Sequence, residues 1–338
     1  MDLNTIWFLL FGVLLAGYAI LDGFDLGVGV LHLFARNEEE RRIHINAIGP
    51  VWDGNEVWLL TGGGALFAAF PAVYATVFSG FYLALVLVLV ALILRAVAFE
   101  FRGKVAAPAW RAVWDAAFGV GSLVPALIFG VAVGNVLRGL PFDAQGDLAV
   151  TLAGLLNPYA LLIGALSLAM FVAHGATYLT LKTEGPLHER IVDWATRLWV
   201  GYVLLFCVAS VTTVGAARYL FEGGGPSVFT WLFGALFVAA ALGYPFAMKA
   251  RRFGVAFTAS SIAIAAQIAL AAAALYPRLV PSRPDLARSL TIYNASSSPR
   301  TLMVMLVVAL VGMPFVVGYT IWIYRVFRGR TVLTGTSY

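Results

Sequence analysis

The sequence contains very little cysteine and very little charge. Its 338 residues include one cysteine, Cys207, so the chain alone can form neither an internal disulfide nor a cysteine-ligated zinc or iron–sulfur site. Charged residues make up 12% of the chain, about half of the roughly 25% that is usual in soluble domains. A soluble domain could not cover a composition that is 61% hydrophobic. The composition therefore excludes a soluble enzyme and indicates a polytopic membrane protein.

The common signatures of nucleotide, metal and acyl-transfer chemistry are also missing. No phosphate-binding loop, dinucleotide fingerprint, zinc signature or Ser–His–Asp arrangement stands out. The net charge of +5 does not indicate nucleic acid, because a small excess of Lys and Arg is typical of the cytoplasmic loops of membrane proteins. We therefore expect neither a nucleic-acid partner nor a metal site in this chain.

Long apolar stretches are what the sequence has instead. A helix needs about 20 apolar residues to cross the hydrocarbon layer, and no alternating β-barrel pattern is present. The sequence predicts an all-α fold in which residues 1–338 form a single integral membrane domain with nine spans. These spans cover residues 5–34, 52–70, 73–101, 112–137, 157–181, 194–220, 227–248, 254–276 and 302–326. The stretch 52–70 is the weakest of them, because it contains Gly62-Gly63-Gly64.

The distribution of Lys and Arg predicts the orientation of these spans. With the N-terminus outside, 15 of these residues fall in inner loops and the C-terminal tail, and 6 fall in outer loops. Positive residues concentrate on the cytoplasmic side of membrane proteins. We therefore expect an outer N-terminus and a cytoplasmic C-terminus, with Ser298-Pro299 as the start of the last helix.

Five carboxylates lie in or beside the first three spans, where ionisable groups are costly and mark functional sites. Asp22 and Asp25 are three residues apart late in the first span, so they share a helix face. Asp53 and Glu56 repeat this spacing at the start of the second span, and Glu100 lies at the inner end of the third. In the predicted orientation all five occupy the cytoplasmic half. We interpret them as a funnel for proton uptake.

The same acids also have a structural interpretation. Asp53 and Glu56 lie in a first helical turn, where acids stabilise the positive end of the helix dipole, so capping and function are equally expected for them. Asp22 and Asp25 lie well inside a span, which favours function. Arg95, within the third span, is expected to be a buried counter-ion for one of these acids.

His174 is the only histidine deep in a predicted span. A buried histidine can ligate haem or relay protons. A haem held by two histidines would need a second deep histidine, whereas His32, His44 and His188 are expected at the inner surface. Hydrogen bonding is therefore favoured over haem ligation for His174, and no cofactor-binding residue can be named.

Small residues in the first span predict a close helix contact. Gly23 and Gly27 are four residues apart and form a small-xxx-small pattern. Such patterns allow two membrane helices to approach closely.

Two motifs are distinctive when taken together. They are Asp22-Gly23-Phe24-Asp25-Leu26-Gly27-Val28-Gly29 and Trp52-Asp53-Gly54-Asn55-Glu56-Val57-Trp58-Leu59. With residues 62–69, 99–104, 175–179 and 293–297, they closely resemble subunit II of cytochrome bd quinol oxidases over nearly the whole chain.

The resemblance implies a heterodimer. Subunit I would carry three haems, two of b type and one of d type, and this chain would be its haem-free partner, with nine helices arranged as two bundles and one peripheral helix. The complex would oxidise quinol and reduce oxygen to water in a bacterial or archaeal cell membrane, electrogenically but without pumping protons. A bound quinone, membrane lipid and a small single-helix accessory subunit are further partners that it implies.

The resemblance also implies a proton path. Carried over by motif, its positions are Asp53, Glu100 and Lys104, although many relatives have Asp where Glu100 stands. Two other functions stay open. A proton-coupled secondary transporter would need broken helices in two symmetric halves, and a structural scaffold for a haem subunit would need no proton path.

Overall fold

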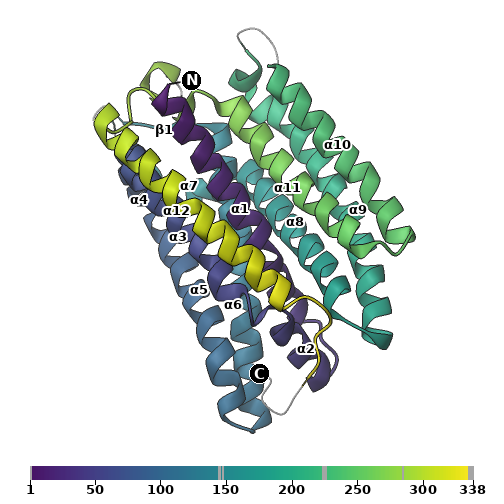
Figure 1. Cartoon of the computed structure of the whole chain (residues 1–338). Helices are drawn as coiled ribbons and strands as arrows, with labels where there is room; N and C mark the ends of the chain where they lie inside the picture. Colours follow the sequence, from purple (N-terminus) through teal and green to yellow (C-terminus); the bar gives the residue numbers. More distant parts are fainter. Residues whose placement is uncertain (1, 144–145, 147, 223–226, 284, 334–338) are drawn as a thin grey trace.

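The computed structural model describes residues 2–143, 146, 148–222, 227–283 and 285–333. Its helices form an elongated bundle, with the start of the first helix and the end of the last at opposite ends (Figure 1). Eight of the described helices are long and apolar enough to cross a membrane. They are α1 (Leu3–His32), α5 (Tyr82–Phe101, continued by the turn η1, Arg102–Lys104), α6 (Pro108–Arg138), α8 (Pro158–Lys182), α9 (Gly185–Ala216), α10 (Val228–Lys249), α11 (Phe253–Leu275) and α12 (Pro299–Val326). The predicted all-α, polytopic fold is confirmed.

The predicted second span is helix α3 (Trp52–Ala69), which is not apolar enough to count among these eight. Two acids and three consecutive glycines lower its hydropathy. It nevertheless runs antiparallel to α1, as two contacts show. Asn55 at the start of α3 donates to the carbonyl oxygen of Leu21, late in α1, and Gly62 in the middle of α3 lies beside Leu14, earlier in α1. It therefore returns the chain to the end of the bundle where α1 begins (Figure 1).

Two predicted spans have different boundaries in the structure. The stretch 73–101 is not one helix but two, α4 (Pro71–Gly80) and α5, which are separated at Phe81. Gly80 leaves room there for the Leu148 side chain, which comes from a loop at this end of the bundle. The stretch 194–220 begins earlier, at Gly185, because Gly185-Pro186 starts α9 and its polar first turns precede the apolar part.

A three-turn helix between the first two predicted spans was not predicted. Helix α2 (Glu38–Ile48) is capped by Asn37, whose side chain accepts a hydrogen bond from the Glu40 N–H at 2.9 Å. Its first turns are charged, so the sequence does not show the apolar periodicity of a helix. Ile45 and Ile48 nevertheless form a short apolar face that packs into the core. The predicted cap of the last helix is confirmed, since the Ser298 side chain accepts from the Thr301 N–H.

Short elements close the end of the bundle where the N-terminus lies. They are α7 (Leu152–Leu155), η2 (Arg218–Phe221), η3 (Leu286–Arg288), a parallel pair of strands, β1 (Leu140–Pro141) with β3 (Ser282–Arg283), and an antiparallel pair, β2 (Arg278–Val280) with β4 (Leu290–Thr291). Apolar side chains of α7, β1, β2 and β4 form one cluster with α1, α3 and α4, in which Phe70, Val280 and Ile292 are almost completely buried.

Helix α8 lies at the centre of the bundle. It packs against α1 and α6 on one side and α9 and α11 on the other, and one buried core runs through all of these helices. Helix α12 is peripheral: it crosses the outside of α1 and α3 (Figure 1), and Leu302 is the one buried residue among its 28, all of which are described.

A close helix contact joins α1 and α8 at Gly27 and Gly175. A Cβ atom added at Gly27 would lie 1.9 Å from the carbonyl oxygen of Phe171, and one added at Gly175 would lie 2.6 Å from the Gly27 backbone. Gly23 faces the Phe171 ring on the same side of α1. The contact predicted from Gly23 and Gly27 therefore exists, and it brings α1 into backbone contact with the central helix.

This contact predicts a specific loss of stability. In Gly27→Ala the new methyl group meets backbone rather than a movable side chain, so α1 and α8 must separate. We expect the free energy of unfolding to fall by about 1–3 kcal/mol, the usual cost of overpacking. Gly12→Ala on the same helix has open space for its methyl group and is the matched control. Thermal unfolding of the purified protein measures both, and equal midpoints would contradict the packing argument.

Candidate functional site

A buried ion pair joins α1 to α5. The Arg95 guanidinium donates two hydrogen bonds to the Asp22 carboxylate, at 3.0 Å and 2.5 Å. Both side chains are completely buried. The planar guanidinium matches the two carboxylate oxygens in a bidentate geometry, so this pair fixes how α5 lies against α1.

The second acid of the motif, Asp25, belongs to a chain of hydrogen bonds. Asn55 of α3 donates from its side-chain amide to Asp25 at 2.8 Å, and the Tyr324 hydroxyl of α12 donates to the Asn55 side-chain oxygen at 2.9 Å. The other oxygen of Asp25 has no hydrogen-bond partner among the described residues. Asn55 and Tyr324 were not predicted as site residues, although Asn55 lies within the second motif.

Charge balance separates the roles of these two acids. Asp22 and Asp25 are both completely buried, and Arg95 is the cation bound between α1 and α5. Glu56, partly buried on α3, adds a third acid within electrostatic range of Arg95 and Asp22. A single guanidinium neutralises one carboxylate, and an uncompensated buried charge is strongly unfavourable. Asp22 takes the cation, so Asp25 is the acid suited to hold a proton.

The three positions carried over as a proton path lie at the surface of the chain. Asp53 is in the first turn of α3, Glu100 is the last but one residue of α5, and Lys104 is in the turn η1; all three are exposed. The rings of Trp52 and Phe99 stack with centroids 4.6 Å apart. Since these rings immediately precede Asp53 and Glu100, the two acids lie at the same level of the bundle.

Glu100 and Lys104 are four residues apart, a spacing that would place them on one face of a continuous α-helix, but they do not share such a helix. Helix α5 ends at Phe101, and the chain tightens into a 3₁₀ turn. Arg102 in this turn is buried and donates to Asp115 of α6 and to Glu38 of α2. These bonds hold Arg102 inward.

Arg102 belongs to an ionic network that was not predicted. Asp115 also contacts the His32 Nε2 at 2.7 Å, and Glu38 accepts a further hydrogen bond from Arg111 at 3.1 Å. Partial burial acts to raise the pKa of Glu38, but hydrogen bonds and charge from the arginines outweigh it, so the pKa lies below that of a free glutamate. The network anchors α2, α6 and η1 to one another as ionised groups at neutral pH.

His174 is fully engaged in hydrogen bonds. Its Nδ1 lies 2.7 Å from the Ser260 hydroxyl of α11, and its Nε2 lies 3.0 Å from the Ile20 carbonyl oxygen of α1. The ring also stacks on Phe257, with centroids 4.8 Å apart. Both ring nitrogens therefore serve to join helices α1, α8 and α11, and neither has a free lone pair directed at a ligand.

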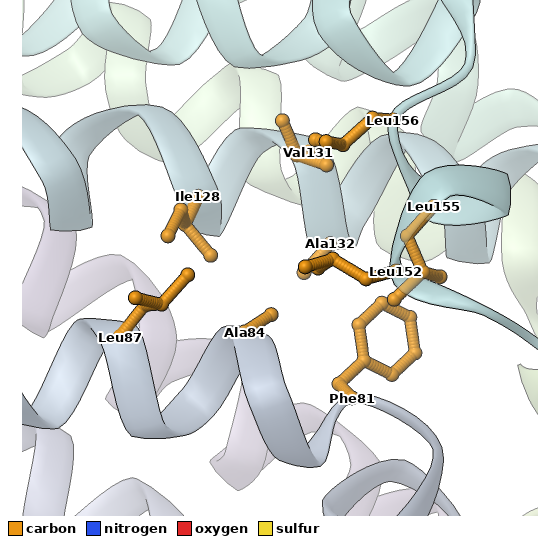
Figure 2. Close-up of a pocket in the computed structure, with 9 residues that line it drawn as sticks. All are labelled: Phe81, Ala84, Leu87, Ile128, Val131, Ala132, Leu152, Leu155 and Leu156. Carbon is orange, nitrogen blue, oxygen red and sulfur yellow. The ribbon is translucent and has the colours of Figure 1, made fainter.

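A small apolar cavity opens between α5, α6 and α7. Its volume is about 100 Å³, and Figure 2 shows the side chains around it, including Phe81, Leu87, Ile128 and Leu155. All nine lining residues are apolar. The cavity is smaller than the usual 300–1,000 Å³ of a ligand pocket and offers no polar group to orient a headgroup. A bound quinone stays a prediction without an assigned place.

No group of three or more His, Cys, Asp or Glu side chains within the described ranges could hold a metal ion.

Comparison with known proteins gives consistent matches over nearly the full length. The model of the family described as cytochrome bd terminal oxidase subunit II matches residues 3–327. The chain is 41% identical to cytochrome bd-I ubiquinol oxidase subunit 2 of Escherichia coli K12, over 97% of this chain and 95% of that protein. It is 39% identical to cytochrome bd ubiquinol oxidase subunit 2 of Bacillus subtilis, over 97% of each. It is 42% identical to a probable cytochrome oxidase subunit 2 of Haemophilus influenzae, over 97% of this chain and 95% of that protein.

A solved structure has the same fold. The structure of bd oxidase from Geobacillus thermodenitrificans contains a chain that aligns with a TM-score of 0.78, covering 97% of this chain and 99% of that one, at 19% identity.

The ion pair between Arg95 and Asp22 predicts a non-additive pattern in a double-mutant cycle. Removing one partner leaves a buried charge, so Asp22→Asn or Arg95→Gln alone should destabilise the protein by about 3–5 kcal/mol. The double variant removes both charges and should recover most of that loss. Thermal unfolding of protein purified from membranes measures the cycle. Additive losses in the double variant would show that the pair is not the unit that stabilises α1 against α5.

Proposed function

Because the chain belongs to the family of cytochrome bd terminal oxidase subunit II, we propose that it is the haem-free subunit of a quinol oxidase and conducts protons to its partner. The membership rests on the family match over residues 3–327 and on identities of about 40% to relatives that align over nearly their full length. The named relatives are subunits of ubiquinol oxidases. In this proposal the chain assembles with subunit I in a bacterial cell membrane, the complex oxidises quinol and reduces oxygen to water, and it does not pump protons.

The exposure of Asp53 and Glu100 carries the proposal of proton conduction. Both carboxylates lie on the outside of α3 and α5, at one level of the bundle, where a partner subunit can adjoin them. An exposed carboxylate can exchange a proton with water or with a group of an adjoining subunit. Asp22 differs, because its two oxygens are held by Arg95. We assign Asp53 and Glu100 to proton transfer and Asp22 to structure.

Asp25 and Lys104 complete the proposed path. Asp25 has one carboxylate oxygen bound by Asn55 and one without a partner among the described residues, so it can hold a proton inside the bundle. Lys104, exposed just after the end of α5, adds a positive charge at this end of the bundle.

The surroundings of His174 support a chain without haem. A haem ligand must offer a ring nitrogen to iron, and both nitrogens of His174 bind groups of this chain. The described residues around this histidine therefore do not fit a haem. We assign the three haems to the partner subunit. This chain conducts protons to that subunit and supports it structurally.

The proposed direction of proton uptake depends on orientation. Fifteen Lys and Arg residues fall in the loops and tail of the end where α12 finishes, against six at the other end. This asymmetry supports a cytoplasmic C-terminus. Asp53, Glu100 and Lys104 lie near that end, so the path would begin at the cytoplasm.

Neutral variants test the conduit. Asp53→Asn or Glu100→Gln removes the exchangeable proton while preserving side-chain size. Each should slow quinol-driven oxygen consumption by about tenfold or more, which corresponds to about 1.4 kcal/mol in the barrier. The matched control is Asp193→Asn, an exposed acid of α9 paired with Arg197 in an i,i+4 ion pair of little energetic weight.

The haem spectrum of the assembled complex distinguishes the outcomes. An intact spectrum with slow turnover supports proton conduction. Loss of haem with loss of turnover would assign the two acids to assembly, and full turnover in both variants would leave the chain as a scaffold.

Cysteine labelling tests the orientation. In a Cys207→Ser background, Val228→Cys and Val332→Cys place exposed thiols at opposite ends of the bundle. An impermeant thiol reagent added to intact cells should label the cysteine at 228 and spare the one at 332. The reverse pattern would place the proposed proton path on the outer side of the membrane.

A further inference from the structure

A second cavity lies at the end of the bundle where the chain finishes. It has a volume of about 290 Å³ and is enclosed by the end of α8, the connection from α2 to α3 and the tail that follows α12. In Figure 1 this tail turns past α2 after leaving α12. Lys182, Arg328 and Arg330 line the cavity, and its described lining residues include no acid. The cavity is therefore positively charged.

Lys182 fixes the shape of this cavity. Its ammonium group donates to the Phe327 carbonyl oxygen at 2.6 Å, and its own carbonyl oxygen accepts from the Thr331 N–H at 2.9 Å. These two bonds hold the tail across the end of α8. They leave the lysine with further N–H donors, and its ammonium lies 5.6 Å from the centre of the Tyr178 ring that forms one wall.

The charge of this cavity contrasts with its surroundings. Arg102 and Arg190, two other cations at this end of the bundle, are bound by Glu38 and Glu40. Of the three cations of the cavity, Arg330 contacts Glu184, an acid outside the lining, at 3.2 Å. One contacting acid against three cations leaves a net positive charge. An anion bound here would compensate it.

The position of the cavity along the membrane-spanning helices indicates which kind of anion it binds. Lys182 and Val326 are the last residues of α8 and α12, so the cavity lies where two spans leave the hydrocarbon layer. We propose that it binds the phosphate headgroup of an anionic phospholipid. Basic pockets at the ends of membrane helices are suited to such headgroups.

The surface beside the cavity favours a lipid over free phosphate. Val51, Val326 and Val332 add apolar lining next to the cations. The outer face of α12, which ends at the cavity, exposes Ile321 and Trp322. Acyl chains can lie along this face while the headgroup stays between the basic side chains, whereas a soluble anion would gain nothing from the apolar part.

Lipid titration of the assembled complex tests the proposal. Native mass spectrometry of delipidated complex gives the apparent Kd for phosphatidylglycerol, with phosphatidylcholine as the neutral comparison. Arg328→Gln with Arg330→Gln keeps the Lys182 bonds to the tail. It should weaken phosphatidylglycerol binding about 30-fold, equal to about 2 kcal/mol. The matched control, Arg197→Gln with Arg252→Gln, removes two exposed charges elsewhere and should change the Kd less than twofold.

Three results would overturn the proposal. Equal phosphatidylglycerol binding by the double variant and the unaltered protein would show that the cavity does not take the lipid. Equal binding of phosphatidylglycerol and phosphatidylcholine that depends on these arginines would exclude recognition of an anionic headgroup. Displacement of the lipid by millimolar inorganic phosphate would assign the cavity to a soluble anion. None of these outcomes depends on whether Asp53 and Glu100 conduct protons.

Discussion

The bidentate pair between Arg95 and Asp22 is the interaction on which the arrangement of the first helices depends. Both groups are completely buried, and either charge alone would be strongly unfavourable inside the bundle. The pair therefore links α5 to α1 at this level through the two side chains. Close contact of α1 with α8 at Gly27 and Gly175 sets the other side of α1. With α1 fixed from two sides, Asp25 is held next to Asn55 and Tyr324.

The charges of the chain fall into two groups with different physical roles. Arg102, Asp115 and Glu38 are bound to one another by several hydrogen bonds and fasten α2, α6 and η1. Such groups stay ionised, because each supports the other. Asp53 and Glu100 lie on the exposed side of α3 and α5. A fixed network and a set of accessible acids at the same end suit a chain that both supports a partner and supplies it with protons.

Sequence patterns predict where the helices of this fold lie better than they predict which helices contact one another. Long apolar runs predicted eight of the membrane helices, because burial in lipid leaves few alternatives. They could not predict α2, whose charged turns resemble a loop, or the break at Phe81, because the sequence stays largely apolar on both sides of it. For the site, the motifs located Asp22 and Asp25. Asp115 was missed because an acid near a helix start resembles a cap, and only the fold brings it to Arg102 and His32.

The three functional interpretations make different demands on these residues. A transporter needs a polar site between two halves of the protein, but the polar contact at the centre of this bundle is His174 with Ser260 and Ile20, which binds helices together. A scaffold accounts for that contact and for the pair of Arg95 with Asp22, since both only stabilise packing. A scaffold does not explain why the Asp53 and Glu100 carboxylates lie on an exposed face, at the level of the stacked Trp52 and Phe99 rings. Proton supply to an adjoining subunit uses both sets of residues, the buried ones to hold the helices and the exposed ones to carry the proton.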